Sequence, residues 1–376
     1  MEFSLMEDTV LVKNNAERFL KEKSPASFVK AMIKDEKGYS PAIWKEMAEL
    51  GWLGFIYDEK YGGMSGAFFD LFILFKEIGK TLLPSPFFCS AVLAGLILNE
   101  AGDEKLKESY LPSIIQGEKI LTVALMDDRG RWDAKGQSLA AREQAGSSYG
   151  LNGTRLLVPF AHIADEIITC ASVQGAKNQG PTLFKIDRKA PGLKVVPLPT
   201  ITEEKTFAVV YENVKAIGEN KIGDPGKGDQ YVNRVLPKAI LLKCGEMLGG
   251  MERAVEMTVE YAKQRFQFGR PIGSLQVIQH YCADMSTLLE STRLLTYQAA
   301  SLFSDGLPCH KEVAMAKAWC NDAYKKVTGM GHQIYAGIGF TEEHDLHLYY
   351  KHAKASELAL GDSHDHRAIV AREMGL

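Results

Sequence analysis

The hydrophobic pattern of this chain changes period twice, and this restricts the folds open to it. Apolar residues recur at helical spacing in the first part, form short β-branched runs in the middle, and return to helical spacing at the end. The second change falls at IGDPGKG, residues 222–228, which has the composition of a linker. We therefore expect an α+β chain with a helical domain at 1–118, a β-domain at 119–225 and a second helical domain at 226–376.

Local signals predict where several elements begin and end. In SPAIWKEMAELG, Ser40 is the expected N-cap, Pro41 the first helical residue and Gly51 the stop. In YGLNGTRL, the pair Asn152-Gly153 lies between two strand-like runs and predicts a type I′ hairpin turn. The C-terminal segment predicts four long helices, at about 229–265, 275–304, 309–336 and 346–376.

Composition narrows the classes of protein. A chain of 376 residues with 46% hydrophobic content can bury a sizeable core, and a net charge of -3 leaves no broad basic face for nucleic acid. The six cysteines form no CxxC pair, which is typical of a reducing compartment. The N-terminus lacks the features of a signal peptide, and no apolar run approaches the roughly 18 residues that a membrane span needs. We expect a cytoplasmic protein without membrane insertion.

The stretch YAKQRFQFGRPIGSLQ, residues 261–276, interrupts the helical pattern with an unusual turn. Taken alone, Arg265 could complement the dipole at a helix C-terminus and Gln276 could be a solvated cap. However, residues 261–285 resemble the C-terminal helical domain of acyl-CoA dehydrogenases. HQIYAGIGF (332–340) is similar to that family's Gln-x-x-Gly-Gly-x-Gly turn, and HRAIVARE (366–373) to its closing helix. The resemblance covers essentially the whole chain. It implies a helical domain, a middle β-barrel or sandwich and a C-terminal four-helix bundle.

The resemblance also implies residues for one part of a flavin-binding site, the part that contacts the pyrophosphate and adenosine of FAD. In this family the arginine of the Arg-x-x-Phe-Gly turn and the following glutamine reach across a subunit interface to the pyrophosphate and adenosine of the neighbour's FAD. A guanidinium suits this role because it pairs with two phosphate oxygens and stays charged. The positions that match the cofactor-binding set are Arg265, Gln267, Phe268, Gln276, Gln333 and Gly337.

The other half of the flavin site departs from the family pattern. Where the family has Thr-Glu-Pro followed by Gly-Ser-Asp, the run ALMDDRGRWDA has Met126 and Asp127 and no Gly-Ser-Asp. Where it has Trp-Ile-Thr, we match Leu156, Leu157 and Val158. Valine has no hydroxyl, so that side chain cannot donate the hydrogen bond made at flavin N5.

The family's catalytic base is also missing. Desaturation requires a carboxylate that removes the α-proton while hydride passes to the flavin. The two positions from which members supply it match Leu360 and Ala239, both apolar. Glu246 and Asp362 are the nearest acids, and for each we expect solvation or helix capping rather than catalysis. We therefore assign no catalytic residue to this chain.

Six of the nine histidines lie between residues 332 and 366. His-x-x-His spacing alone does not make a zinc site, which also needs a third ligand and supporting hydrogen bonds. We expect surface and interface histidines and no metal site.

Three functions follow from the resemblance. The favoured one is a non-catalytic subunit of a heteromeric, FAD-dependent acyl-CoA dehydrogenase, paired as α2β2 with a related chain and passing electrons to electron-transfer flavoprotein. The second is an active homotetramer with an unorthodox base. The third is a flavin-free acyl-CoA-binding or scaffold protein.

Overall fold

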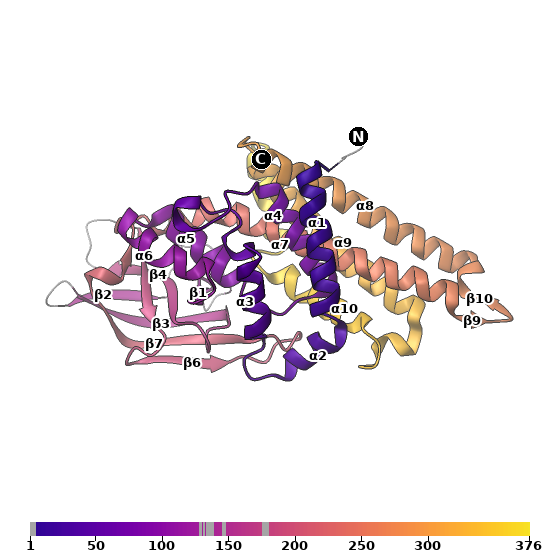
Figure 1. Cartoon of the computed structure of the whole chain (residues 1–376), viewed down its shortest axis with the longest axis horizontal. Coiled ribbons are helices and arrows are strands. Elements are labelled where there is room, and N and C mark those ends of the chain that lie inside the picture. The colour runs from indigo at the N-terminus through magenta and orange to yellow at the C-terminus, as the bar shows by residue number, and fades with distance from the viewer. Residues whose placement is uncertain (1–4, 128–129, 131, 133–138, 145–147, 175–179) are drawn as a thin grey trace. The chain divides into compact units, whose positions relative to one another are not determined.

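The computed structural model describes residues 5–127, 130, 132, 139–144, 148–174 and 180–376 (Figure 1). It comprises two compact units. The helical unit consists of Met1–Val29, Ala67–Leu83 and Ile240–Leu376, and the sheet unit consists of Lys30–Gly66 and Pro84–Ala239. The long helix α7 (Gly228–Gln264) and the short helix α2 (Ala26–Lys34) each contribute residues to both units.

The helical unit combines two N-terminal helices with the C-terminal ones. Its other helices are α1 (Glu7–Lys23), α4 (Phe68–Thr81), α8 (Gln276–Ser304), α9 (His310–Tyr335), α10 (Leu346–Leu358) and α11 (Ser363–Glu373). The first three helices predicted in the C-terminal segment are confirmed to within a residue or so. The fourth is two helices, because Leu360 and Gly361 have positive φ angles of 60° and 99° that interrupt the helical backbone.

Glycines bring α4 and α7 into close contact. A Cβ at Gly79 would lie 1.9 Å from the backbone oxygen of Glu246, and one at Gly249 would lie 1.8 Å from that of Lys76. This close approach buries Lys76, whose Nζ pairs with Glu252 at 2.8 Å. An N-terminal helix is thereby part of the same core as the C-terminal helices.

The sheet unit contains one eight-stranded sheet in the order β6-β7-β3-β2-β4-β5-β8, with β1 also paired to β4. The strands are β1 (Leu121–Ala124), β2 (Ala140–Gln144), β3 (Ser148–Pro159), β4 (Glu166–Gln174), β5 (Pro181–Asp187), β6 (Leu193–Pro197), β7 (Thr206–Ala216) and β8 (Lys221–Ile222). The helices are α3 (Pro41–Glu49), the π-helix η3 (Phe88–Ala94), α5 (Gly95–Ala101) and α6 (Glu104–Ile115). Ser40 caps α3 through the Ile43 N–H, and Gly51 has a φ of 76°, so both predicted ends are confirmed.

The predicted hairpin turn at Asn152-Gly153 is wrong. Both residues lie inside β3, and the connection from β2 to β3 at 145–147 lies outside the described residues. Asn152 instead accepts a hydrogen bond from the Asn213 N–H at 2.8 Å, where the β3–β7 register shifts. The Asn-Gly pair therefore forms a bulge against β7.

Candidate functional site

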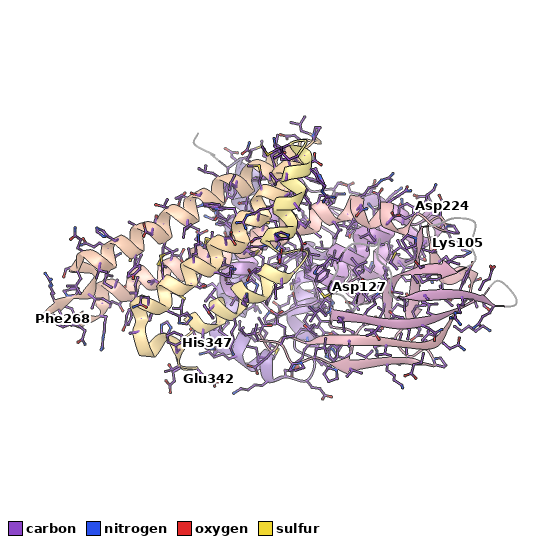
Figure 2. All side chains as sticks on the ribbon, turned by 180° about the vertical axis from the view of Figure 1, so that it is seen from behind. Lys105, Asp127, Asp224, Phe268, Glu342 and His347 are labelled. Carbon is purple, nitrogen blue, oxygen red and sulfur yellow. The ribbon has the colours of Figure 1, made fainter. Side chains whose placement is uncertain are left out.

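A two-stranded hairpin follows α7 in the helical unit. Its strands are β9 (Phe266–Gln267) and β10 (Arg270–Pro271), and the turn residues Phe268 and Gly269 have φ angles of 54° and 76°. Two consecutive positive φ angles are characteristic of a type I′ turn. Figure 2 shows Phe268 at the tip of this hairpin, where its side chain is 86% exposed. The turn thus presents an aromatic ring to solvent.

Arg265 stands at the base of this hairpin. Its N–H donates to the Tyr261 oxygen, and its carbonyl accepts from the Ile272 N–H, both at 2.8 Å. The backbone is therefore fixed while the residue is exposed. Among the described residues, the Arg265 guanidinium has neither a hydrogen-bond nor an ion-pair partner.

Helix packing brings the remaining matched residues to the same end of the helical unit. Near the C-terminal end of α9, Tyr335 stacks on Tyr261 of α7 at 4.1 Å between ring centroids. Gln333 of α9 and Tyr281 of α8 line one groove. Gln276 is the first residue of α8. Arg265, Gln276 and Gln333 are thus exposed on neighbouring elements at one end of the unit.

Gly337 lies in the turn η6 (Ala336–Phe340) that follows α9. A Cβ at Gly337 would have no neighbour within 4 Å, so its backbone is open to an approaching group. Ala336 occupies the first glycine of the Gln-x-x-Gly-Gly-x-Gly pattern with φ 52° and ψ -138°, a conformation that L-residues rarely adopt. Buried His332 stacks on exposed Phe340 at 4.6 Å and supports the turn.

This end of the unit exposes several apolar side chains. Phe266, Val277, Ile338 and Phe340 are each at least 47% exposed. An exposed guanidinium, two amides and an open glycine backbone provide hydrogen-bond donors. A diphosphate and a nucleoside accept hydrogen bonds from such groups. The donor chemistry of these residues fits the pyrophosphate and adenosine half of an FAD.

Among the residues of the sheet unit that the structure describes, the matched positions do not offer a comparable set for a flavin ring. Met126 and Asp127 are both buried, and the run beyond them lies largely outside the described residues. Val158 is 0% exposed in the sheet core, so placing it toward a ligand is wrong. The half-buried neighbours are Leu157, with φ 50°, and Pro159. Neither side chain has a hydrogen-bond donor, and proline also lacks the backbone N–H.

Both positions that match the family's base are buried and apolar. Ala239 is 0% exposed within α7. Leu360 is 5% exposed, and its carbonyl is held by His366 Nε2 at 3.0 Å. Lys317, fully buried below this turn, donates to Ser356 O at 2.9 Å and Gly361 O at 3.3 Å. These bonds fix the backbone on both sides of Leu360.

Glu246 is held in an ion-paired network. Its Oε2 lies 2.6 Å from Lys243 Nζ and its Oε1 2.7 Å from His352 Nε2. Burial alone would raise the pKa of Glu246, but Lys243 and His352 lower that pKa to about 2. A general base works best with a pKa near the operating pH, so this carboxylate is poorly suited to proton abstraction.

Asp362 is the N-cap of α11. Its side chain accepts from the N–H groups of His364 and Asp365 at 2.8 and 2.9 Å. These backbone hydrogen bonds lower the pKa of Asp362. The expected helix capping is therefore confirmed for Asp362, whereas the expectation for Glu246 is wrong, because its carboxylate is shielded and ion-paired rather than solvated.

The expectation of surface and interface histidines is wrong for His332, His352 and His366, which are buried within the chain. His347 bonds to the His344 carbonyl at 2.6 Å, and His310 to Glu373 at 2.9 Å. Within the described ranges, no group of three or more His, Cys, Asp and Glu residues is arranged to hold a metal ion. No helix among those residues is long and apolar enough to cross a membrane. All six cysteines are free thiols.

Comparison with known proteins identifies the family. Residues 6–118 match the model of the acyl-CoA dehydrogenase N-terminal domain, and residues 226–375 match that of the C-terminal domain. The short-chain specific acyl-CoA dehydrogenase of Megasphaera elsdenii is 30% identical over 339 residues, 87% of this chain and 88% of the relative. The chain therefore belongs to the acyl-CoA dehydrogenase family of FAD-dependent oxidoreductases.

Solved structures agree with this assignment. The butyryl-CoA dehydrogenase structure from Megasphaera elsdenii superposes with a TM-score of 0.90, covers 100% of both chains and is 27% identical. A chain of the ChsE4-ChsE5 complex from Mycobacterium tuberculosis has a TM-score of 0.89 and 26% identity, with 100% and 99% coverage. The expected order of helical domain, β-sheet domain and C-terminal helical domain is confirmed.

Proposed function

We propose that this chain is a non-catalytic subunit of an FAD-dependent acyl-CoA dehydrogenase, which desaturates an acyl-CoA thioester. It lends Arg265, Gln267, Phe268, Gln276, Gln333 and Gly337 to the pyrophosphate and adenosine half of a partner's FAD. The observation that carries the proposal is the contrast between two sites. Donors for the nucleotide half are exposed, whereas Leu360 and Ala239 occupy the base positions.

The assembly we infer is an α2β2 heteromer in the cytoplasm. The related chain would carry the base and the ring half of the flavin site, and electron-transfer flavoprotein would accept the electrons. A relative in the ChsE4-ChsE5 complex supports pairing between two chains of this kind. FAD supplies the hydride acceptor when bound, and the residues named here would position its diphosphate and adenosine.

Flavin retention tests the proposal. Arg265→Ala should weaken FAD binding in the assembled complex by about 1.5–3 kcal/mol, the range for a hydrogen bond to a charged group, or roughly 10- to 100-fold. Arg270→Ala is the matched control, because Arg270 is exposed in the same hairpin but outside the matched set. FAD occupancy is measured by absorbance after dialysis of complexes co-expressed with the related chain.

The purification also separates the alternatives. A colourless lone chain that turns yellow on co-expression supports the heteromer, and a yellow, active homomer supports an active homotetramer. A chain that stays colourless with every family partner supports an acyl-CoA-binding scaffold. Equal FAD retention by Arg265→Ala and Arg270→Ala would remove Arg265 from the diphosphate contact.

A further inference from the structure

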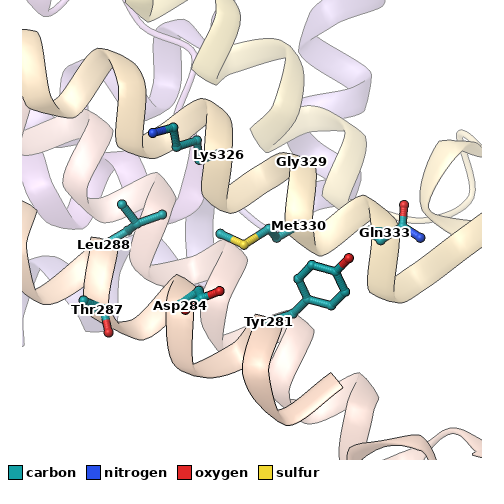
Figure 3. Close-up of a pocket in the computed structure, with 8 residues that line it drawn as sticks. All are labelled: Tyr281, Asp284, Thr287, Leu288, Lys326, Gly329, Met330 and Gln333. Atoms are coloured by element: carbon teal, nitrogen blue, oxygen red, sulfur yellow. The ribbon is translucent and has the colours of Figure 1, made fainter. Parts of the chain in front are cut away.

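The turn η6, which carries Gly337, is held from inside the helical unit by a histidine. His332 and Gln333 are successive residues of α9, so their side chains point in different directions around the helix. Gln333 points outward and lines a groove with Tyr281 of α8 (Figure 3). His332 points inward, where its ring stacks on Phe340, the last residue of the turn, at 4.6 Å between centroids. One helix thus exposes a matched residue and supports the neighbouring turn from the core.

The His332 ring is buried without a polar partner. The residue is 4% exposed, and neither ring nitrogen makes a hydrogen bond to any residue that the structure describes. The Gly339 backbone approaches the ring without reaching hydrogen-bond geometry, and the Tyr350 ring contacts it edge-on at 4.8 Å. A buried hydrogen bond left unmade costs about 1–3 kcal/mol, and phenylalanine would fill an aromatic site without that cost. The property that distinguishes histidine here is protonation near neutral pH.

Protonation of His332 works against this stack. Burial lowers the pKa of His332 below its ordinary 6.5, positive charge on His347 and His344 lowers that pKa further, and the Gly339 backbone opposes these effects. Those two histidines and the Tyr350 phenol are the titratable groups of the described chain that face the ring. Such a histidine stabilises the closed turn above pH 6.5, and this stabilisation is lost as the pH falls below that value.

The turn needs support because its backbone is strained. Ala336, its first residue, has φ 52° and ψ -138°, a conformation that costs about 1–3 kcal/mol. At that end, the Tyr335 hydroxyl donates to the Met257 carbonyl at 2.7 Å, and burial raises the pKa of Tyr335 to about 12. This hydrogen bond therefore persists at neutral and acidic pH. The other end, where Phe340 stacks on His332, is the one that responds to acid.

We propose that His332 is a positioning residue for the residues that contact a partner's FAD, and that it makes their site sensitive to acid. In its neutral form it stacks on Phe340 and holds η6 in the conformation that presents Gly337. In its protonated form it leaves the stack, the turn opens, and the partner's FAD is released more readily. The inference rests on the proposed function and adds regulation to it.

Hydrogen exchange of residues 336–340 tests the turn without flavin. Mass spectrometry of the purified chain measures this exchange at about pH 7.5 and about pH 5, corrected for the intrinsic rates at each pH. The opening equilibrium of the wild-type turn should rise at least about threefold at the lower pH. His332→Phe keeps an aromatic stack and cannot be protonated, so it should remove this rise. His332→Gln loses the stack as well, so its turn should be more open than wild type at the higher pH and show no further rise.

Flavin retention tests the link between the turn and the site. Complexes with the related chain are dialysed at the same two pH values, and bound FAD is measured by absorbance. Acid should weaken FAD binding at least about threefold more in wild type than in His332→Phe. His364→Phe is the matched control, because His364 is an exposed histidine of the same unit. It should show the wild-type acid response in both measurements.

Equal acid responses of wild type and His332→Phe, in either measurement, would overturn the proposal. An acid response of the turn that survives in His332→Gln would do the same. Failure of the proposed function looks different. In that case Arg265→Ala and Arg270→Ala would retain equal FAD, while the turn of the lone chain would still respond to acid through His332.

Discussion

The substitution Glu246→Gln tests whether Glu246 has a structural or a catalytic role. Glutamine keeps the shape of the side chain but removes the charge that faces Lys243 and His352. Both ends of the Lys243–Glu246 pair are largely shielded, with side chains 14% and 15% exposed, so solvent screens the pair only weakly. The substitution therefore removes the negative charge that lies 2.6 Å from the Lys243 ammonium in a shielded position.

Two routes give the same magnitude for this loss. Lowering the pKa of Glu246 from the ordinary 4.5 to about 2 corresponds to roughly 3 kcal/mol of stability at neutral pH. Removing one partner of a buried ion pair typically costs about 3–5 kcal/mol. We expect Glu246→Gln to lower the free energy of unfolding by about 3 kcal/mol at pH 7, while turnover of the complex stays within about threefold of wild type.

The pH dependence adds a signature specific to this carboxylate. Because its folded pKa lies below its unfolded value, Glu246 contributes its full stability above pH 4.5 and loses it as pH falls toward about 2. The difference between wild type and Glu246→Gln should therefore shrink as pH falls through that window. Urea unfolding followed by tryptophan fluorescence measures the free energy of unfolding of each protein. Glu256→Gln is the control. Glu256 is 44% exposed on the same helix and should contribute less than about 1 kcal/mol.

Two outcomes would refute this reasoning. A fall in turnover of about a hundredfold or more, with FAD content unchanged, would show that Glu246 removes the proton. Equal unfolding free energies for Glu246→Gln and wild type at pH 7 would show that the ion-paired network does not stabilise the fold.

Substitutions at two further positions, Ala336 and Asp362, test turns of the helical unit. Ala336→Gly should stabilise the chain by about 1 kcal/mol, because the relieved backbone strain of about 1–3 kcal/mol exceeds the added entropy of unfolded glycine; a lower thermal midpoint would contradict this. Asp362→Asn should change neither stability nor turnover, since asparagine also caps helices, whereas Asp362→Ala should cost about 1 kcal/mol. Loss of turnover in Asp362→Asn with intact folding would assign the base to Asp362.

The sequence predicted features that depend on near neighbours in the chain. Ser40, Pro41 and Gly51 fix the ends of α3 through contacts within a few residues. The predicted turn at Asn152-Gly153 is wrong because the conformation there depends on a residue far away in the chain. A hydrogen bond from Asn213, 61 residues away, selects a bulge over a hairpin turn. Local propensity cannot report a partner strand at that distance.

The same distinction holds at the candidate site. Arg265, Gln276 and Gln333 were found through motifs, but their shared location depends on how α7, α8 and α9 pack. The partner of Glu246, His352, is 106 residues away and carries no local signal. Lys317 did leave a signal, since it interrupts an apolar stripe in EVAMAKAWC, and a buried lysine could have been inferred there.

Energetics supports a lending role for the exposed end of the helical unit. Phe268 and Ala336 both adopt positive φ angles, and Phe268 is 86% exposed, so the isolated chain gains nothing evident from either conformation. Leu360, Ala239 and Val158 contribute buried apolar surface to their own units, so the isolated chain benefits from each. A chain that acted alone would be more stable if the backbones of Phe268 and Ala336 were relaxed. It would also need polar side chains in place of Leu360, Ala239 and Val158. Under the proposed function, a second chain and its nucleotide would cover these strained, exposed residues, and Arg265→Ala tests that arrangement.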